Sequence, residues 1–75
     1  MATDWLELKD QGNVHFTANQ FDEALVCYNA ALEIRGLQPK DQAEVHRCKA
    51  GCYIKMGRYL EAIDEASKCE LNIVS

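Results

Sequence analysis

The 75-residue sequence predicts an all-α fold in which two antiparallel helical hairpins form a short right-handed solenoid. The first observation behind this prediction is an internal repeat, in which a small residue, an aromatic residue and spaced alanines recur in the same order. These landmarks are Gly12, Phe21, Ala24, Tyr28 and Ala31 in the first half, and Ala50, Tyr59, Ala62, Ala66 and Cys69 in the second. The second observation is that the chain has only one Pro and four Gly, which favours helices over loops and sheets. The chain from Phe21 to Tyr59 covers one repeat and slightly more. A helical repeat of this length is typical of stacked arrays, in which each hairpin buries its apolar face against the next.

The composition is that of one folded domain spanning residues 1–75. Apolar residues make up 48% of the chain and charged residues 27%, which is typical of globular rather than disordered proteins. No apolar run is long enough to cross a bilayer, and residues 1–5 carry neither the basic segment nor the apolar core of a secretory signal. We therefore expect a cytoplasmic protein with no membrane partner.

The first expected helix begins after Thr3 or Asp4, either of which can cap it, and runs to about Thr17. Its apolar residues recur at three- and four-residue steps and form one buried stripe. The members of this stripe are Trp5, Leu8, Gly12 and Phe16. Because a glycine inside a helix costs about 1 kcal/mol relative to alanine, Gly12 predicts the close approach of a partner helix.

The second expected helix runs from Phe21 to Ile34, after a turn in which Asn19 is the capping residue. Two acidic residues in its first turn suit the positive end of the helix dipole. Its expected inner face consists of Phe21, Ala24, Leu25, Tyr28, Ala31 and Leu32. These two helices make up repeat one, at about residues 4–37.

A break at Gly36 and Pro39 separates the two repeats, because glycine stops a helix and proline cannot continue one. A capping box formed by Asp41 and Glu44 then predicts the start of a third helix, which runs to about Met56. One side of this helix is marked by Val45, Lys49, Cys52, Tyr53 and Met56, although Ala50 rather than Lys49 is expected to face the neighbouring helix.

The fourth expected helix runs from Arg58 to about Leu71, after Gly57 ends the third. Its expected inward residues are Tyr59, Ala62, Ile63, Ala66 and Cys69. We interpret residues 72–75 as a frayed tail and assign repeat two to about residues 41–72.

The net charge of −4 argues against a nucleic acid partner. Residues 42–56 carry three cations against one anion, whereas residues 58–71 carry four anions against two cations. This asymmetry is consistent with a basic groove and an acidic back, and equally with two solvated faces that hold local ion pairs. The sequence leaves both interpretations open.

The four cysteines do not indicate a metal site or a disulfide framework. Without a secretory signal, disulfides are the weaker interpretation. Cys48 and Cys52 share a helix face, and His15 or His46 could lie nearby, but the spacing matches no standard zinc pattern. Free cysteines at such positions behave as small apolar residues. We also find no Ser-His-Asp set and no glycine-rich phosphate loop, so we expect no cofactor and no enzymatic activity.

The segment from Lys9 to Asn13, with the sequence Lys-Asp-Gln-Gly-Asn, resembles the opening of tetratricopeptide repeat (TPR) modules in co-chaperones of the carboxylate-clamp class. Three further segments resemble the N-terminal TPR module of the UCS-domain myosin chaperones. They run from Gln38 to Arg47, from Ala50 to Lys55 and from Glu65 to Lys68. The resemblance covers nearly the whole chain.

This resemblance implies a groove for the acidic C-terminal tail of a heat-shock chaperone, which ends in Glu-Glu-Val-Asp. In such modules a Lys and an Asn on the first helix hold the terminal carboxylate, and these positions match Lys9 and Asn13. Because the two residues are four apart, they lie one turn apart on one helix face and can close on a single carboxylate.

The family pattern is incomplete in this sequence. An Asn of the second repeat falls on Cys48, and a thiol is a weak hydrogen-bond donor. The family also uses a Lys and an Arg from a third repeat, which these two repeats do not contain. Lys49 and Arg47 could place compensating cations near the groove. The candidate peptide-binding residues are therefore Lys9, Asn13, Cys48 and Lys49, in a weakened clamp.

A second function remains open on the sequence alone. Two stacked repeats leave one face of the second hairpin uncovered, because each repeat of an array buries its apolar face against a neighbour. The module could therefore be structural and self-associate through this face as a homodimer.

Overall fold

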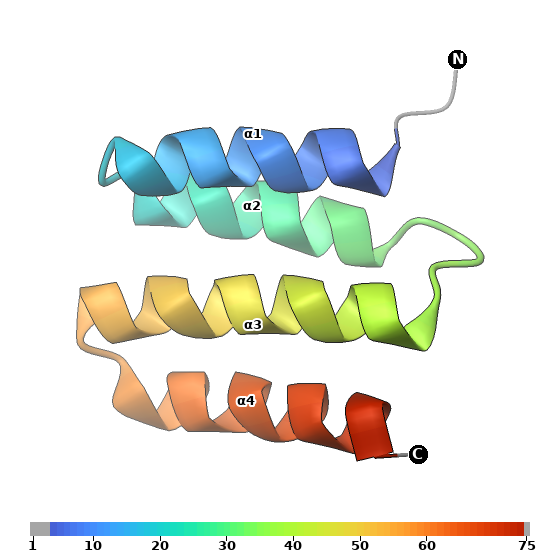
Figure 1. The fold of residues 1–75 in the computed structure, drawn as a ribbon. Helices are drawn as coiled ribbons and strands as arrows, with labels where there is room; N and C mark the ends of the chain where they lie inside the picture. Colours follow the sequence, from blue (N-terminus) through green and yellow to red (C-terminus); the bar gives the residue numbers. More distant parts are fainter. Residues whose placement is uncertain (1–3, 75) are drawn as a thin grey trace.

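The computed structural model describes the backbone of residues 4–74 and the side chains of residues 4–68. Four helices follow one another: α1 (Trp5–Thr17), α2 (Phe21–Leu32), α3 (Pro39–Met56) and α4 (Tyr59–Val74). They form two antiparallel hairpins, α1–α2 and α3–α4, which lie side by side, with α2 further back than α1 and α3 in this view (Figure 1). The described residues contain no strand, so the predicted all-α hairpin architecture is confirmed.

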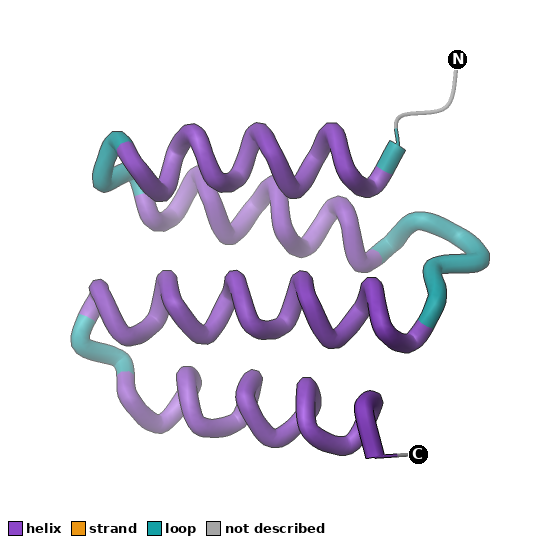
Figure 2. The backbone as a smooth tube through the Cα atoms, viewed as in Figure 1, coloured by secondary structure: helices purple, strands orange, loops and turns teal. Residues whose placement is uncertain are grey.

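Short connections hold the helices antiparallel (Figure 2). The turn between α1 and α2 depends on Asn19, which has a left-handed φ of 65°. Asn tolerates this conformation better than most residues. Gln20 rather than Asn19 precedes α2 as its N-cap, so the predicted capping role of Asn19 is wrong. Asp4 does occupy the N-cap of α1, although its side chain makes no capping hydrogen bond.

The third helix begins three residues earlier than the sequence predicted. Pro39 stands in the first turn of α3, where the fixed φ of proline suits a helix. The N–H that proline lacks would have no hydrogen-bond acceptor within the helix at this position. Gln38 is the N-cap, so the capping box predicted at Asp41 and Glu44 does not form. At the other end Gly57, with a φ of 78°, ends α3 in the left-handed conformation that glycine adopts without strain.

Two further boundaries differ from the prediction. Helix α2 ends at Leu32 instead of Ile34. Helix α4 continues to Val74, so the backbone of residues 72–74 is helical and does not form the predicted frayed tail.

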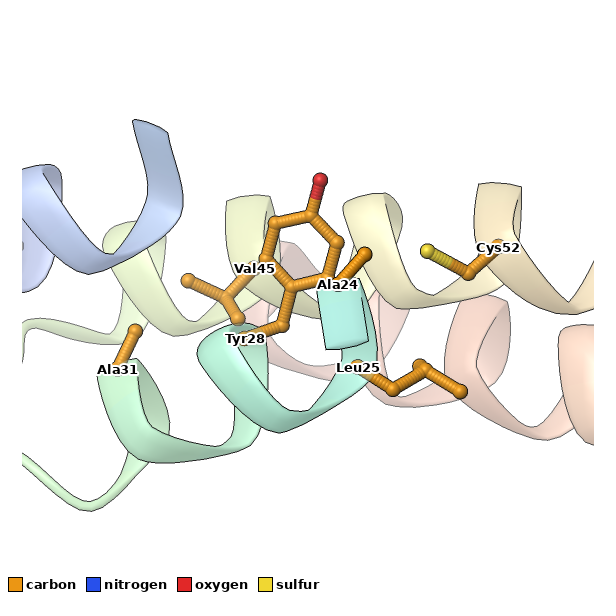
Figure 3. Close-up of a cluster of buried hydrophobic side chains, with 6 residues drawn as sticks. All are labelled: Ala24, Leu25, Tyr28, Ala31, Val45 and Cys52. Atoms are coloured by element: carbon orange, nitrogen blue, oxygen red, sulfur yellow. The ribbon is translucent and has the colours of Figure 1, made fainter. Parts of the chain in front are cut away.

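The core lies where α2 packs on α1 and α3 (Figure 3). Its buried members are Ala24, Leu25, Tyr28 and Ala31 from α2 and Val45 and Cys52 from α3. Partly buried residues of α1, α2 and α3 surround them, among them Trp5, Leu8, Phe16 and Leu32. The predicted inner face of α2 and the apolar role of Cys52 are confirmed, whereas the side chain of Cys69 lies outside the described residues.

The α3–α4 hairpin contains a buried ionic cluster. The carboxylate of Glu65 lies 2.6 Å from Nδ1 of His46 and 3.3 Å from Nζ of Lys49. Glu65 itself is only 5% exposed. Lys68 of α4 reaches the same carboxylate at 3.7 Å. Lys49 of α3 and Glu65 of α4 thus form a local ion pair between the two helices.

The inward face predicted for α4 is only partly correct. Ala62 is buried, but Tyr59 and Ile63 are 62% and 63% exposed, and Ala66 is exposed as well. Together with Ala50 and Ile54 of α3, these residues line an apolar hollow of about 320 Å³ on the surface. Within the described residues, this face of the second hairpin is uncovered.

No helix in the described part of the chain is both long enough and apolar enough to span a membrane. The side chains described also bring no three His, Cys, Asp or Glu residues together as a metal site.

A candidate peptide groove between α1 and α3

Helices α1 and α3 face each other across α2 in a parallel register. Three pairs of facing residues show this register, and the members of each pair are 35 residues apart. The pairs are Lys9 with Glu44, Asn13 with Cys48, and Phe16 with Gly51. Because helical positions at steps of three and four share a face, α1 and α3 each present one continuous row of residues to the space between them.

The floor of this space is the ring of Tyr28, which reaches up from α2. A hollow of about 180 Å³ opens above it, lined by Asn13, Phe16, Tyr28, Cys48 and Gly51. Its lining is mainly apolar, and Gly51 leaves room beside the Phe16 ring. Such a hollow suits a small apolar side chain beside a polar anchor.

Lys9 supplies the cation at one end of the groove. Its Nζ donates to Oε2 of Glu44 and lies 5.4 Å from the centre of the Trp5 ring. The hydrogen bond to Glu44 raises the pKa of the Lys9 ammonium above its ordinary value. The side chain is only 15% exposed and stays cationic at neutral pH.

Asn13 stands one turn further along α1 and is oriented by the floor residue. The Tyr28 hydroxyl donates to Oδ1 of Asn13 at an O···O distance of 2.5 Å. This bond assigns the oxygen of the amide to Tyr28 and leaves Nδ2 as a donor, because one oxygen and one nitrogen make up the amide. Among the described residues, no acceptor engages Nδ2, so Asn13 retains a free donor beside the hollow.

Cys48 lies opposite Asn13 as a half-buried thiol. Burial raises its pKa, and the Lys9 charge only partly opposes this effect. The thiol is therefore protonated at neutral pH and is a poor nucleophile. It contributes a small apolar surface to the hollow where an amide would contribute a donor.

The Lys49 side chain does not extend into the groove. It is 8% exposed and forms an ion pair with Glu65 of α4. Of the four residues predicted from the sequence, Lys9, Asn13 and Cys48 thus meet in one groove, whereas Lys49 is not brought to it. Sequence reasoning missed the part that Glu44 plays in the groove. The spacing of Glu44, four residues before Cys48, was the available signal that both lie on one face of α3.

Comparison with known proteins gives a consistent set of relatives. The chain is 37% identical over 65 residues to unc-45 homolog B of Xenopus tropicalis, and 36% identical over 63 residues to the Hsp70-Hsp90 organizing protein of Triticum aestivum. It is 27% identical over 63 residues to heat shock protein STI1 of Saccharomyces cerevisiae. These matches cover 87%, 84% and 84% of this chain.

The chain spans only 7% of the length of the unc-45 relative and 10% of the length of the other two. No family model matches the chain. No solved structure matches it either. The relatives carry TPR modules, and the chain has the corresponding fold of packed helical hairpins. The chain is thus a TPR-type helical module related to the co-chaperones unc-45 homolog B and Hsp70-Hsp90 organizing protein.

Proposed function

We propose that this chain is a peptide-binding co-chaperone module whose groove between α1 and α3 takes the acidic C-terminal tail of a heat-shock chaperone. The tail would end in Glu-Glu-Val-Asp, as the resemblance to clamp-type TPR modules implies. The relatives, which include Hsp70-Hsp90 organizing protein, support a chaperone-related role. The unc-45 relatives support the same broad class.

The observation that carries the proposal is that Lys9 and Asn13 lie one turn apart on α1 and that Asn13 lines an apolar hollow. A cation and a neutral donor about one helical turn apart can hold a terminal carboxylate together, and these two side chains offer both. The hollow beside them accepts an apolar side chain next to the carboxylate. A charge-assisted hydrogen bond of this kind contributes about 1.5–3 kcal/mol.

We expect weak binding. Cys48 provides no amide donor, and Lys49 is held by Glu65 on the other side of α3. The loss of one charged or amide contact costs about 1–3 kcal/mol, which corresponds to as much as about a hundredfold in affinity.

The test is a titration with an acidic peptide that ends in Glu-Glu-Val-Asp, followed by backbone amide shifts. Peptide concentrations up to about 1 mM detect binding free energies as weak as about −4 kcal/mol. We expect saturable shifts centred on Lys9 and Asn13, weakened by added salt because the contact is ionic.

Matched variants identify the contact. Lys9→Ala should weaken binding about tenfold or more, whereas Lys68→Ala removes the same charge from α4 and should change it less than twofold. The same peptide with an amidated C-terminus should lose as much affinity as the Lys9→Ala variant does. Shifts that are insensitive to both changes, or an absence of shifts at about 1 mM peptide, would refute the proposal.

A second candidate function rests on the uncovered apolar face of the second hairpin. Ile54, Tyr59 and Ile63 are each more than half exposed and lie on one hollow surface. This exposure favours a structural module that self-associates through the face. The mass in solution, measured by sedimentation over a wide concentration range, shows whether the chain self-associates. A dimer that Ile63→Glu abolishes would favour this candidate, and a monomer at all concentrations would exclude it.

A further inference from the structure

The cation of the groove already holds a carboxylate in the free protein. Nζ of Lys9 donates to Oε2 of Glu44, which projects from the facing turn of α3. The two residues are 35 positions apart, so the fold and not local helix spacing creates the contact. Glu44 thus places on Lys9 the same chemical group that the end of a peptide would place there.

The two partners differ in how easily they can leave. Lys9 is 15% exposed, and the Trp5 ring lies beside its ammonium, so its position is fixed by packing. Glu44 is 43% exposed and can rotate into solvent on a flexible side chain. Ion pairs with this much exposure contribute little to stability, and an external carboxylate with additional contacts can therefore displace Glu44.

We propose that Glu44 is an internal competitor for the peptide carboxylate and closes the Lys9 end of the groove until a ligand displaces it. This inference rests on the proposed function of the groove. A tethered carboxylate has an effective concentration in about the millimolar range, so a lone carboxylate competes poorly with it. A peptide end succeeds because it also bonds Asn13 and fills the hollow beside Tyr28. Glu44 therefore makes the groove select chain termini over acidic side chains.

The opposite role for Glu44 predicts the opposite change in peptide affinity when Glu44 is removed. If Glu44 instead held Lys9 in position for the ligand, its removal would weaken peptide binding. The measurement of one variant therefore distinguishes competition from positioning.

The test compares Glu44→Gln with the original chain in a titration with the peptide ending in Glu-Glu-Val-Asp. Gln keeps the shape of the side chain and removes its charge, so we expect the affinity to rise about three- to tenfold. Asp10→Asn is the matched control, because Asp10 is an exposed carboxylate next to Lys9 on α1 and makes no bond to it. This control should change the affinity less than twofold.

Two further comparisons connect any gain to Lys9 and to the peptide terminus. In a Lys9→Ala background, Glu44→Gln should give no gain. A peptide with an amidated C-terminus should also bind both proteins equally. Glu44→Asp keeps the charge but shortens the side chain, and it should give an intermediate gain even if the Gln variant folds poorly.

The outcomes separate this inference from the function it rests on. If the original chain binds the peptide and Glu44→Gln binds it equally or more weakly, the inference is wrong and the proposed function stands. An equal gain in Asp10→Asn also overturns the inference, since it would reflect overall charge. If neither protein binds the peptide, both proposals fail.

Discussion

The ring of Tyr28 occupies the space in which a side chain on Gly12 would begin. An ideal Cβ on Gly12 would lie 2.5 Å from Cε1 of Tyr28, well inside the contact distance of two carbon atoms. The ring has little freedom to move, because it is 1% exposed and its hydroxyl bonds Asn13. The Tyr28 side chain thus packs α2 against α1 and also forms the floor of the groove.

We therefore expect Gly12→Ala to destabilise the protein in spite of the better helix propensity of alanine. Overpacking costs about 1–3 kcal/mol, and the propensity gain of about 1 kcal/mol offsets only part of it. Urea unfolding followed by circular dichroism would measure the loss. Gly51→Ala is the control, because its Cβ would meet only Phe16, at an ordinary 3.8 Å. That variant should be stabilised by about 0.5–1 kcal/mol. Equal stability changes in the two variants would contradict the close approach at Gly12.

Tyr28→Phe should cost about 1 kcal/mol and release the amide of Asn13. The substitution keeps the ring that packs against Gly12 and removes only the hydroxyl that donates to Oδ1 of Asn13. The side-chain NH₂ resonances of Asn13 should shift or broaden, because the amide is no longer held in one orientation. Tyr59→Phe removes a hydroxyl from an exposed ring and should leave these resonances in place. Unchanged Asn13 resonances in Tyr28→Phe would show that the hydroxyl does not orient the amide.

Alkaline pH should destabilise the fold through Cys52. Burial raises the pKa of its thiol from an ordinary value near 9 to about 11. Because the folded state holds the proton more tightly, this stability is complete below pH 9 and is lost as the pH rises toward 11. A two-unit shift predicts a loss of roughly 2 kcal/mol by about pH 10.5. Denaturant titrations under reducing conditions at a series of pH values would measure this loss.

Two cysteine variants separate the contribution of Cys52 from other alkaline effects. Cys52→Ala should lower stability at neutral pH and make its fall above pH 9 shallower, since only the raised pKa values of Tyr28 and Cys48 then remain. Cys27→Ala removes one thiol from a half-buried position and should retain the steep fall. A fall that is equally steep in both variants would assign the alkaline effect to other groups.

Lys49→Met should destabilise the second hairpin because it leaves Glu65 with one cation fewer. Lys49 and Glu65 have only 10% and 6% of their side chains exposed, and breaking a buried ion pair is more costly than breaking an exposed one. We expect a loss of about 1–3 kcal/mol in thermal or urea unfolding, below the full cost of an isolated buried charge because His46 still contacts Glu65. Lys68→Met, at a position 47% exposed, should cost less than about 1 kcal/mol. If Lys49→Met instead abolished peptide binding at unchanged stability, Lys49 would act at the groove.

Contacts within each hairpin could be predicted from the sequence because they depend on spacing alone. Gly12 predicted a close helix approach, and Ala24, Ala31 and Ala62 were predicted to lie on the inner faces of their helices. All four are buried. The position of Lys9 and Asn13 on one face of α1 was also predictable, since residues four apart share a helix face.

The sequence could not predict the contacts that depend on which helices pack against each other. Lys49 lies on the same helix as Cys48, and only the position of Glu65 on α4 draws it away from the groove. Glu44 satisfied the local rule for a capping box, but Pro39 already begins the helix, which leaves Glu44 free to reach Lys9. Tyr59 and Ile63 have the periodicity of buried residues, whereas their exposure depends on what packs next to α4.

Each helix has its principal contacts with its neighbours along the chain: α1 with α2, α2 with α3, and α3 with α4. Folding of such a chain closes only short loops, and proteins dominated by local contacts fold within microseconds to milliseconds. The same connectivity lets a helix with one packing neighbour detach without disrupting the rest, as nearest-neighbour arrays do. Within the described residues, helix α1, which carries Lys9 and Asn13, has its principal contacts with α2 alone. A ligand that bridges α1 and α3 would therefore slow hydrogen exchange in α1 more than in the central helices.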